Sequence, residues 1–185
     1  MSARSLLHNS ASLVAGRIAL SALRMISALI VARLAGAADF GAYMLVLAYV
    51  TLFEWLVDFG QTDIAVRDIA HVPARRDTLL TALARIKALQ GVAGAAALPL
   101  LLAMGDDRAL VLAGLVGGAS VLANAWLQPA RAALRLAMRM DRDIAAELAG
   151  TLATLPLLAA AAWAGAPVAL LTAAFAAARL VQAGL

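Results

Sequence analysis

The chain has 185 residues, of which 64% are hydrophobic and 14% charged, and its mean hydropathy is +0.91. Soluble domains have about 45–50% apolar and about 25% charged residues, so this composition excludes a soluble globular domain and indicates an integral membrane protein. The net charge of +4 comes from basic residues near the ends of apolar segments, which argues against nucleic acid as a partner. The absence of cysteine excludes a disulfide framework and a thiolate metal site.

Six apolar segments are long enough to cross a bilayer as helices, which takes about 17–25 residues each. Short stretches that are polar or contain glycine and proline separate them. The segments occupy residues 11–35, 40–59, 79–104, 109–128, 144–164 and 168–185. We therefore expect an all-α polytopic membrane protein in which residues 1–185 form one lobe of six transmembrane helices.

Positive charge alternates between successive connections of these segments. Ten of the fifteen lysines and arginines lie at the N-terminus, around the second connection and in the fourth connection: Arg4, Arg67, Arg75, Arg76, Arg85, Lys87, Arg131, Arg135, Arg139 and Arg142. Loops rich in lysine and arginine stay cytoplasmic, so we expect both termini on the cytoplasmic side. The chain is still apolar at Leu185. This favours the front part of a longer protein, with a naturally short six-helix protein as the alternative.

Two arginines, Arg17 and Arg24, lie inside the first apolar segment, where a charge costs about 2.5–3.5 kcal/mol unless it faces water or a partner. Their spacing is close to two helical turns, so both point to one side, with Ser21 between them and Ser10 extending the stripe. We predict that Arg17, Arg24 and Ser21 line a cavity that binds an anionic substrate. The alternatives are that Arg17 reaches the cytoplasmic headgroups and that Arg24 pairs with a carboxylate of a neighbouring helix.

Two carboxylates, Glu54 and Asp58, are four residues apart in the second segment and therefore share one helix face. A buried carboxylate there is one way to couple transport to protons or sodium. The pair also has simpler uses, because it can neutralise Arg17 across two adjacent helices and Asp58 can mark the end of the span. We favour neutralisation and end-marking over ion coupling.

Further polar and small residues follow helical spacing in later segments. Polar stripes of this kind often hold helices together in a membrane, and glycines four residues apart let two helices approach closely. The polar stripes are Ser120, Asn124 and Gln128, then Glu147, Thr151 and Thr154, and the glycine pair is Gly114 and Gly118. The basic run from Arg131 to Arg142 is interpreted mainly as a device that orients the chain, with anionic headgroups as a secondary partner.

Motifs for catalysis and for metal or nucleotide binding are absent from the sequence. There is no phosphate-binding loop of the ATPase type, and no Ser-His-Asp or Cys-His set can be assembled. His8 and His71 have no companion at metal-ligand spacing. We therefore expect no enzymatic activity and no cofactor.

Residues 30–71 carry a recognisable pattern, IVARLAGAADFGAYMLVLAYVTLFEWLVDFGQTDIAVRDIAH. It resembles the N-terminal signature of bacterial polysaccharide-biosynthesis transporters, the Wzx-type O-antigen flippases, in which A-R-x-L-G-x-x-x-F-G-x-Y links the first two spans. The sequence departs from this signature at Ala35-Gly36, where the family usually has Leu-Gly. The matching residues are Ala32, Arg33, Phe40, Gly41, Tyr43, Asp58, Phe59, Gly60, Val66, Arg67, Asp68, Ile69 and Ala70.

The resemblance implies the fold of the multidrug/oligosaccharidyl-lipid/polysaccharide exporter superfamily, in which two six-helix lobes surround a central cavity. Such proteins move a lipid-linked oligosaccharide across the bacterial inner membrane, and the cavity is cationic because the substrate carries a diphosphate. By this resemblance the chain supplies the N-terminal lobe of a protein with 12–14 helices. The partners implied are the bilayer, the lipid-diphosphate-linked oligosaccharide, a C-terminal lobe or second copy, and other glycan-assembly proteins.

Three other functions remain open at this point. A drug or metabolite exporter of the same superfamily would prefer a cavity rich in carboxylates. A membrane-embedded enzyme of glycan assembly usually needs a large periplasmic loop, and the outer connections here are very short. A structural subunit without transport activity would hold Arg24 paired and buried, with no cavity beside it.

Overall fold

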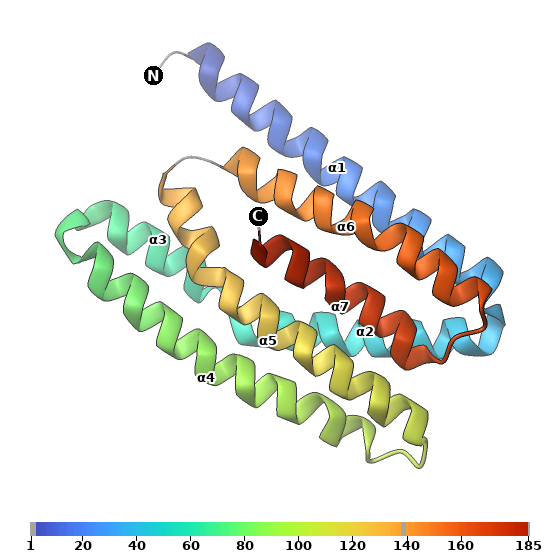
Figure 1. Cartoon of the computed structure of the whole chain (residues 1–185). Coiled ribbons are helices and arrows are strands. Elements are labelled where there is room, and N and C mark those ends of the chain that lie inside the picture. Colours follow the sequence, from blue (N-terminus) through green and yellow to red (C-terminus); the bar gives the residue numbers. More distant parts are fainter. Residues whose placement is uncertain (1–2, 138–139, 185) are drawn as a thin grey trace.

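The computed structural model describes the backbone of residues 3–137 and 140–184 and the side chains of residues 14–137 and 141–179. The side chains of Arg4, His8, Ser10 and Arg139 therefore lie outside the described residues. The described chain is helical throughout and contains no strand (Figure 1). Its elements are α1 (Ala3–Leu34), α2 (Gly36–Asp58), α3 (Gln61–His71), η1 (Pro73–Arg75), α4 (Arg76–Leu102), α5 (Arg108–Leu136), α6 (Met140–Trp163) and α7 (Val168–Gly184).

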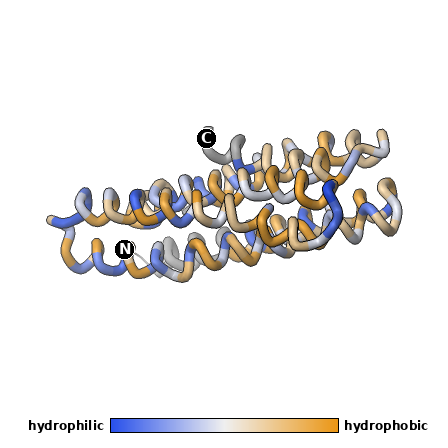
Figure 2. Tube along the Cα trace, turned by 90° about the horizontal axis from the view of Figure 1, so that it is seen from below, coloured by the Kyte–Doolittle hydropathy of each residue, from blue (hydrophilic) through white to orange (hydrophobic). Residues whose placement is uncertain are grey.

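The prediction of an all-α polytopic membrane protein is confirmed. Five helices in the described chain are long and apolar enough to cross a membrane, and they correspond to the first five predicted spans. The sixth predicted span is α7, whose described apolar part, Val168–Arg179, is shorter than the other five. Figure 2 shows apolar residues along the length of the helices, as expected for a bundle surrounded by lipid.

Successive helices run back and forth, so their connections collect at two ends of the bundle (Figure 1). One end holds the N-terminus of α1, the short helix α3 and the junction of α5 with α6, and we call it the α3 end. The opposite end holds the turns that join α1 to α2, α4 to α5, and α6 to α7. The connections rich in arginine are therefore at one end, as the charge pattern of the sequence indicates.

Helix pairing follows chain order only in part, since α4 packs against α5 and α6 against α7, but α1 does not pack along α2. Helix α1 packs along α6, whereas α2 packs against α5 and α4, so α1 and α2 diverge from their shared turn and make few contacts with each other. Helix α7 packs against both α5 and α6. The divergence of α1 from α2 leaves space between them toward the α3 end.

Buried apolar side chains close the bundle at the opposite end. Val31, Tyr43, Leu158 and Leu171 come from four different helices and belong to one cluster of buried residues. All four lie near the turns that face away from α3. Four helices therefore meet through buried apolar side chains at the end away from α3.

The closest helix pair, α4 with α5, is joined by small residues. A Cβ atom added at Gly118 would lie 2.4 Å from the carbonyl oxygen of Ala95, and one at Gly114 would lie 2.7 Å from a methyl group of Leu102. Both distances are shorter than van der Waals contact. The Gly114/Gly118 spacing therefore does allow close helix approach, as predicted.

Candidate functional site

A cavity of about 940 Å³ lies between α1, α2, α5, α6 and α7. Its lining combines apolar and aromatic residues with eight charged side chains, four arginines and four carboxylates. These are Arg17, Arg24, Arg131 and Arg179, together with Glu54, Asp58, Asp63 and Glu147. Tyr43, Leu158 and Ala174 line it toward the apolar end of the bundle. The cavity is therefore polar on the side of α3 and apolar on the other side.

Helix α1 contributes both of its predicted arginines to this lining. Arg24 donates from Nη2 to Oε1 of Glu147 at 2.6 Å, so it has a carboxylate partner and also borders the cavity. Arg17 is exposed in the cavity, and the described side chains include no ion-pair partner for it. Ser21, the third predicted residue, is not part of the lining, and its hydroxyl donates to the backbone carbonyl of Arg17 at 3.0 Å.

Helix α2 places Glu54 and Asp58 on the cavity, and both are paired with cations. The partners differ from the expected Arg17. Glu54 accepts from Nη2 of Arg179 at 2.8 Å, and Asp58 accepts from Nζ of Lys87 at 3.0 Å. Helix α1 packs along α6 rather than along α2, and α4 and α7 supply the cations that meet these carboxylates.

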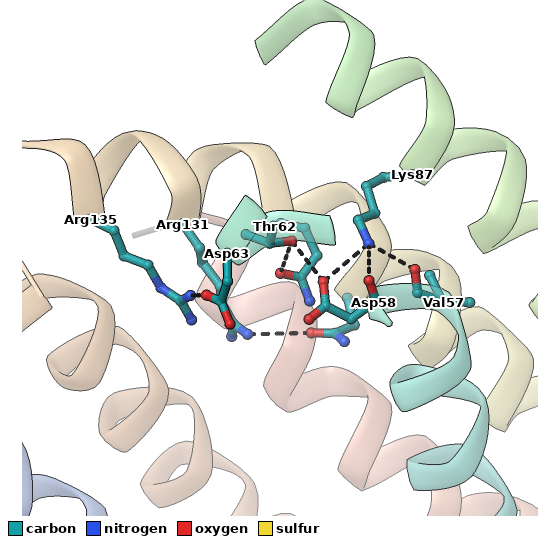
Figure 3. Close-up of polar contacts among 9 residues, drawn as sticks. Val57, Asp58, Thr62, Asp63, Lys87, Arg131 and Arg135 are labelled. Atoms are coloured by element: carbon teal, nitrogen blue, oxygen red, sulfur yellow. Dashed lines mark hydrogen bonds and ion pairs between the residues drawn. The ribbon is translucent and has the colours of Figure 1, made fainter. Parts of the chain in front are cut away.

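Lys87 is fully buried, although the sequence analysis treated it as a cation flanking a loop. Its ammonium group donates to the carbonyl oxygens of Val57 at 2.7 Å and Asp58 at 3.0 Å, as well as to the carboxylate of Asp58 (Figure 3). These carbonyls lack helical donors because α2 ends where Phe59 and Gly60 adopt left-handed backbone angles, with φ of 39° and 73°. Lys87 thus caps the C-terminus of α2, where the helix dipole favours a cation.

The first turn of α3 extends this network toward the cavity. The hydroxyl of Thr62 donates to Oδ1 of Asp58 at 2.7 Å and lies 3.2 Å from the side-chain oxygen of Gln128 on α5 (Figure 3). Asp63 pairs with Arg135, also on α5. The junction of α2 with α3 is therefore tied to α4 on one side and to α5 on the other.

The basic run after Pro129 takes part in the bundle as well. The Arg131 side chain is only 16% exposed, lines the cavity and pairs with Asp143 at 3.2 Å. Arg135 pairs with Asp63 of α3. Sequence reasoning assigned this run to orientation and headgroups, and it missed the position of Arg131 in the cavity.

Polar stripes on α5 and α6 were expected to hold helices together, and most of their members face the cavity. One feature of the sequence could have predicted that these stripes face a cavity, because each stripe shares its helix face with a charged residue. Arg131 lies one turn beyond Gln128, and Glu147 begins the second stripe. The stripe residues in the lining are Asn124, Gln128, Glu147, Thr151 and Thr154, and Ser120 is buried outside it.

Comparison with known proteins identifies the family. Neither the curated proteins nor the solved structures include a significant match to this chain. The family model described as polysaccharide biosynthesis protein matches residues 6–182, which is nearly the whole chain and includes every helix around the cavity. With its membrane-spanning helices and its charged internal cavity, the chain belongs to the polysaccharide biosynthesis protein family.

Proposed function

We propose that the chain forms one lobe of a transporter that flips a lipid-linked oligosaccharide across the bacterial inner membrane. Family membership and membrane-spanning helices support a role in moving glycans at a membrane. The internal cavity supports transport, because a charged glycan carrier needs a hydrated path through hydrocarbon. The second lobe would come from further sequence or from a second copy of the chain.

The position of Arg17 is the observation that carries the proposal. Arg17 lines the cavity, in a helix otherwise apolar enough to span a membrane, and has no ion-pair partner among the described side chains. A guanidinium group presents several donors in a plane and matches the oxygens of a phosphate. A diphosphate is the anion that a lipid-linked oligosaccharide presents, so Arg17 is suited to receive it.

The carboxylates of the lining argue against an exporter of cationic compounds. Each of the four is engaged by a basic side chain of the bundle, so none is left to bind a cationic substrate by itself. The pairs are Glu54 with Arg179, Asp58 with Lys87, Asp63 with Arg135, and Glu147 with Arg24. Among the described lining side chains, Arg17 is then the charged group without an ion-pair partner, which favours an anionic ligand.

The separation of the cavity into a polar side and an apolar side fits the direction of export. If the arginine-rich connections are cytoplasmic, as proposed from the positive-inside rule, the polar side of the cavity faces the cytoplasm and its apolar side faces outward. The proposed cycle then receives the charged substrate from the inside. Rocking of this lobe against the second one would open the other side.

The proposal is tested by substituting Arg17 in the chromosomal gene, so that any further sequence of the same protein is retained. Arg17→Ala removes charge-assisted hydrogen bonds worth about 1.5–3 kcal/mol, which predicts roughly 10- to 150-fold weaker binding of the substrate. Surface glycan should fall and the lipid-linked precursor should accumulate inside the cell. Surface glycan is measured by gel and the precursor by mass spectrometry of lipid extracts.

Arg85→Ala is the matched control, because Arg85 is exposed on α4 and does not line the cavity. It should leave surface glycan and precursor at wild-type levels. Arg17→Lys should retain part of the export, because it keeps the charge and loses the planar fork. Normal export by Arg17→Ala at normal protein abundance would contradict the proposed role.

A further inference from the structure

Arg17 and Arg24 both belong to α1 and both line the cavity, but they differ in whether a carboxylate is bound to them. Arg24 is occupied by Glu147 of α6 at 2.6 Å, whereas Arg17 has no such partner among the described side chains. Both members of the Arg24–Glu147 pair line the cavity. An anion that enters can therefore bind Arg17 directly and can bind Arg24 only by displacing a carboxylate that is already there.

The Arg24–Glu147 ion pair is one in which another anion can displace the glutamate from the arginine. Its arginine side chain is 60% exposed and its glutamate side chain 19%, so water competes for the guanidinium group and weakens the pair relative to a buried one. The neighbouring pair of Arg179 with Glu54 is different, because its side chains are only 10% and 12% exposed. Arg179 also lies over the ring of Phe175, 5.8 Å from its centroid, which holds it in place. Of these two pairs, the exposed one is the one that a ligand can open.

We propose that Glu147 is an internal competitor for the substrate diphosphate, a residue that determines affinity by occupying Arg24 when the cavity is empty. The inference rests on the proposed function and specifies how the anion site releases its ligand. A diphosphate binds at Arg17 and reaches Arg24 by replacing Glu147. When the diphosphate leaves, Glu147 takes its position again. The carboxylate thus lowers affinity for the anion and keeps the site from trapping its substrate.

The test measures binding of radiolabelled farnesyl diphosphate, a simple lipid diphosphate, to the whole protein in lipid nanodiscs. Glu147→Gln removes the competing charge and keeps the size of the side chain. From the usual strength of exposed ion pairs we expect roughly two- to fivefold tighter binding. A tighter complex cannot result from a damaged site, so this direction separates competition from a merely structural role. Asp141→Asn is the matched control, because Asp141 is exposed on the same helix and outside the cavity lining.

Two further variants show whether Glu147 acts through Arg24. In an Arg24→Ala background, Glu147→Gln should no longer tighten binding, because no guanidinium group is freed. Glu147→Asp keeps the charge and should bind like the wild type. The inference would be overturned if Glu147→Gln leaves affinity unchanged or weakens it, if Asp141→Asn tightens binding equally, or if the gain persists without Arg24.

The same experiment separates the inference from the proposed function. If the wild type binds farnesyl diphosphate and Glu147→Gln does not bind it more tightly, only the competitor role fails. If neither protein binds the diphosphate, the anion site itself fails and the competitor role fails with it.

Discussion

Lys87 is a charged residue that is completely buried in a bundle of membrane-spanning helices. It is tolerated because its three ammonium hydrogens are matched by three oxygen acceptors at the end of α2. Two of these acceptors are carbonyls that the break at Phe59 and Gly60 leaves without helical donors. The lysine and the break in the helix therefore depend on each other.

Replacing Lys87 by methionine should destabilise the protein. The substitution keeps much of the volume of the side chain but leaves the end of α2 without its donor and the Asp58 carboxylate without its cation. Hydrogen bonds to charged groups are each worth about 1.5–3 kcal/mol, so we expect a loss in that range or above it. The measurement is thermal unfolding in detergent, with Arg85→Met, an exposed position two residues earlier, as the control. Equal melting temperatures for Lys87→Met and the wild type would show that the cap is dispensable.

At the scale of elements, the α4–α5 pair depends on the absence of side chains at its glycines. A methyl group at Gly118 would meet the backbone oxygen of Ala95 at 2.4 Å, and a backbone atom can move only if the helix moves. In a membrane such close contact is a main source of helix association, because lipid offers no hydrophobic driving force between helices.

Gly118→Ala should therefore push α4 and α5 apart and destabilise the bundle by about 1–3 kcal/mol, as overpacked cores do. Gly41→Ala is the matched control, because Gly41 is helical and has open space around the position of an added Cβ. That change should be neutral or stabilising, since alanine favours a helix over glycine by roughly 0.5–1 kcal/mol. The two variants are compared by thermal unfolding in the same detergent. A melting temperature for Gly118→Ala at or above that of Gly41→Ala would refute the packing account.

Sequence reasoning predicted the elements far better than their pairing. The spans could be read from hydropathy because each must cover the same thickness of hydrocarbon, whatever its neighbours are. Helical spacing also predicted that Glu54 and Asp58 share a face, and both do line the cavity. Spacing says nothing about which helix that face meets, so it could not find Arg179 or Lys87 as the partners.

The same limit applies to the site on α1. The positions of Arg17 and Arg24 on one helix face follow from their spacing, and the structure places both at the cavity. Ser21 lies between them in sequence but is not part of the lining, whereas Ser27 on the same helix is, so spacing alone did not identify which serine borders the cavity. The approach of Glu147 to Arg24 depends on the packing of α1 along α6, which no local pattern records.

At the scale of the whole molecule, the two ends of the bundle differ in charge. The α3 end carries most of the arginines and the polar side of the cavity, and the opposite end is closed by apolar side chains. The proposed orientation places the α3 end in the cytoplasm. This orientation sets from which side the cavity is loaded, so it has to be tested independently of transport.

Residues 1–185 contain no cysteine, so a cysteine introduced at one of these positions is labelled against an unlabelled parent lobe. Arg75→Cys lies on η1 at the α3 end, and Asp106→Cys lies in the turn between α4 and α5. A maleimide that does not cross membranes should label position 106 in intact spheroplasts and position 75 only after the membrane is opened. The reverse pattern would invert the topology and place the polar side of the cavity outside.

The central claim, that Arg17 receives the diphosphate of a lipid carrier on its way across the membrane, is tested most directly in proteoliposomes. The measurement is the transbilayer movement of a fluorescent polyprenyl-diphosphate disaccharide, with the whole protein reconstituted as wild type or as Arg17→Ala. We expect the wild type to move the probe well above the rate of empty vesicles and Arg17→Ala to be at least about tenfold slower. Equal rates for the two proteins, or a wild type no faster than empty vesicles, would contradict the claim.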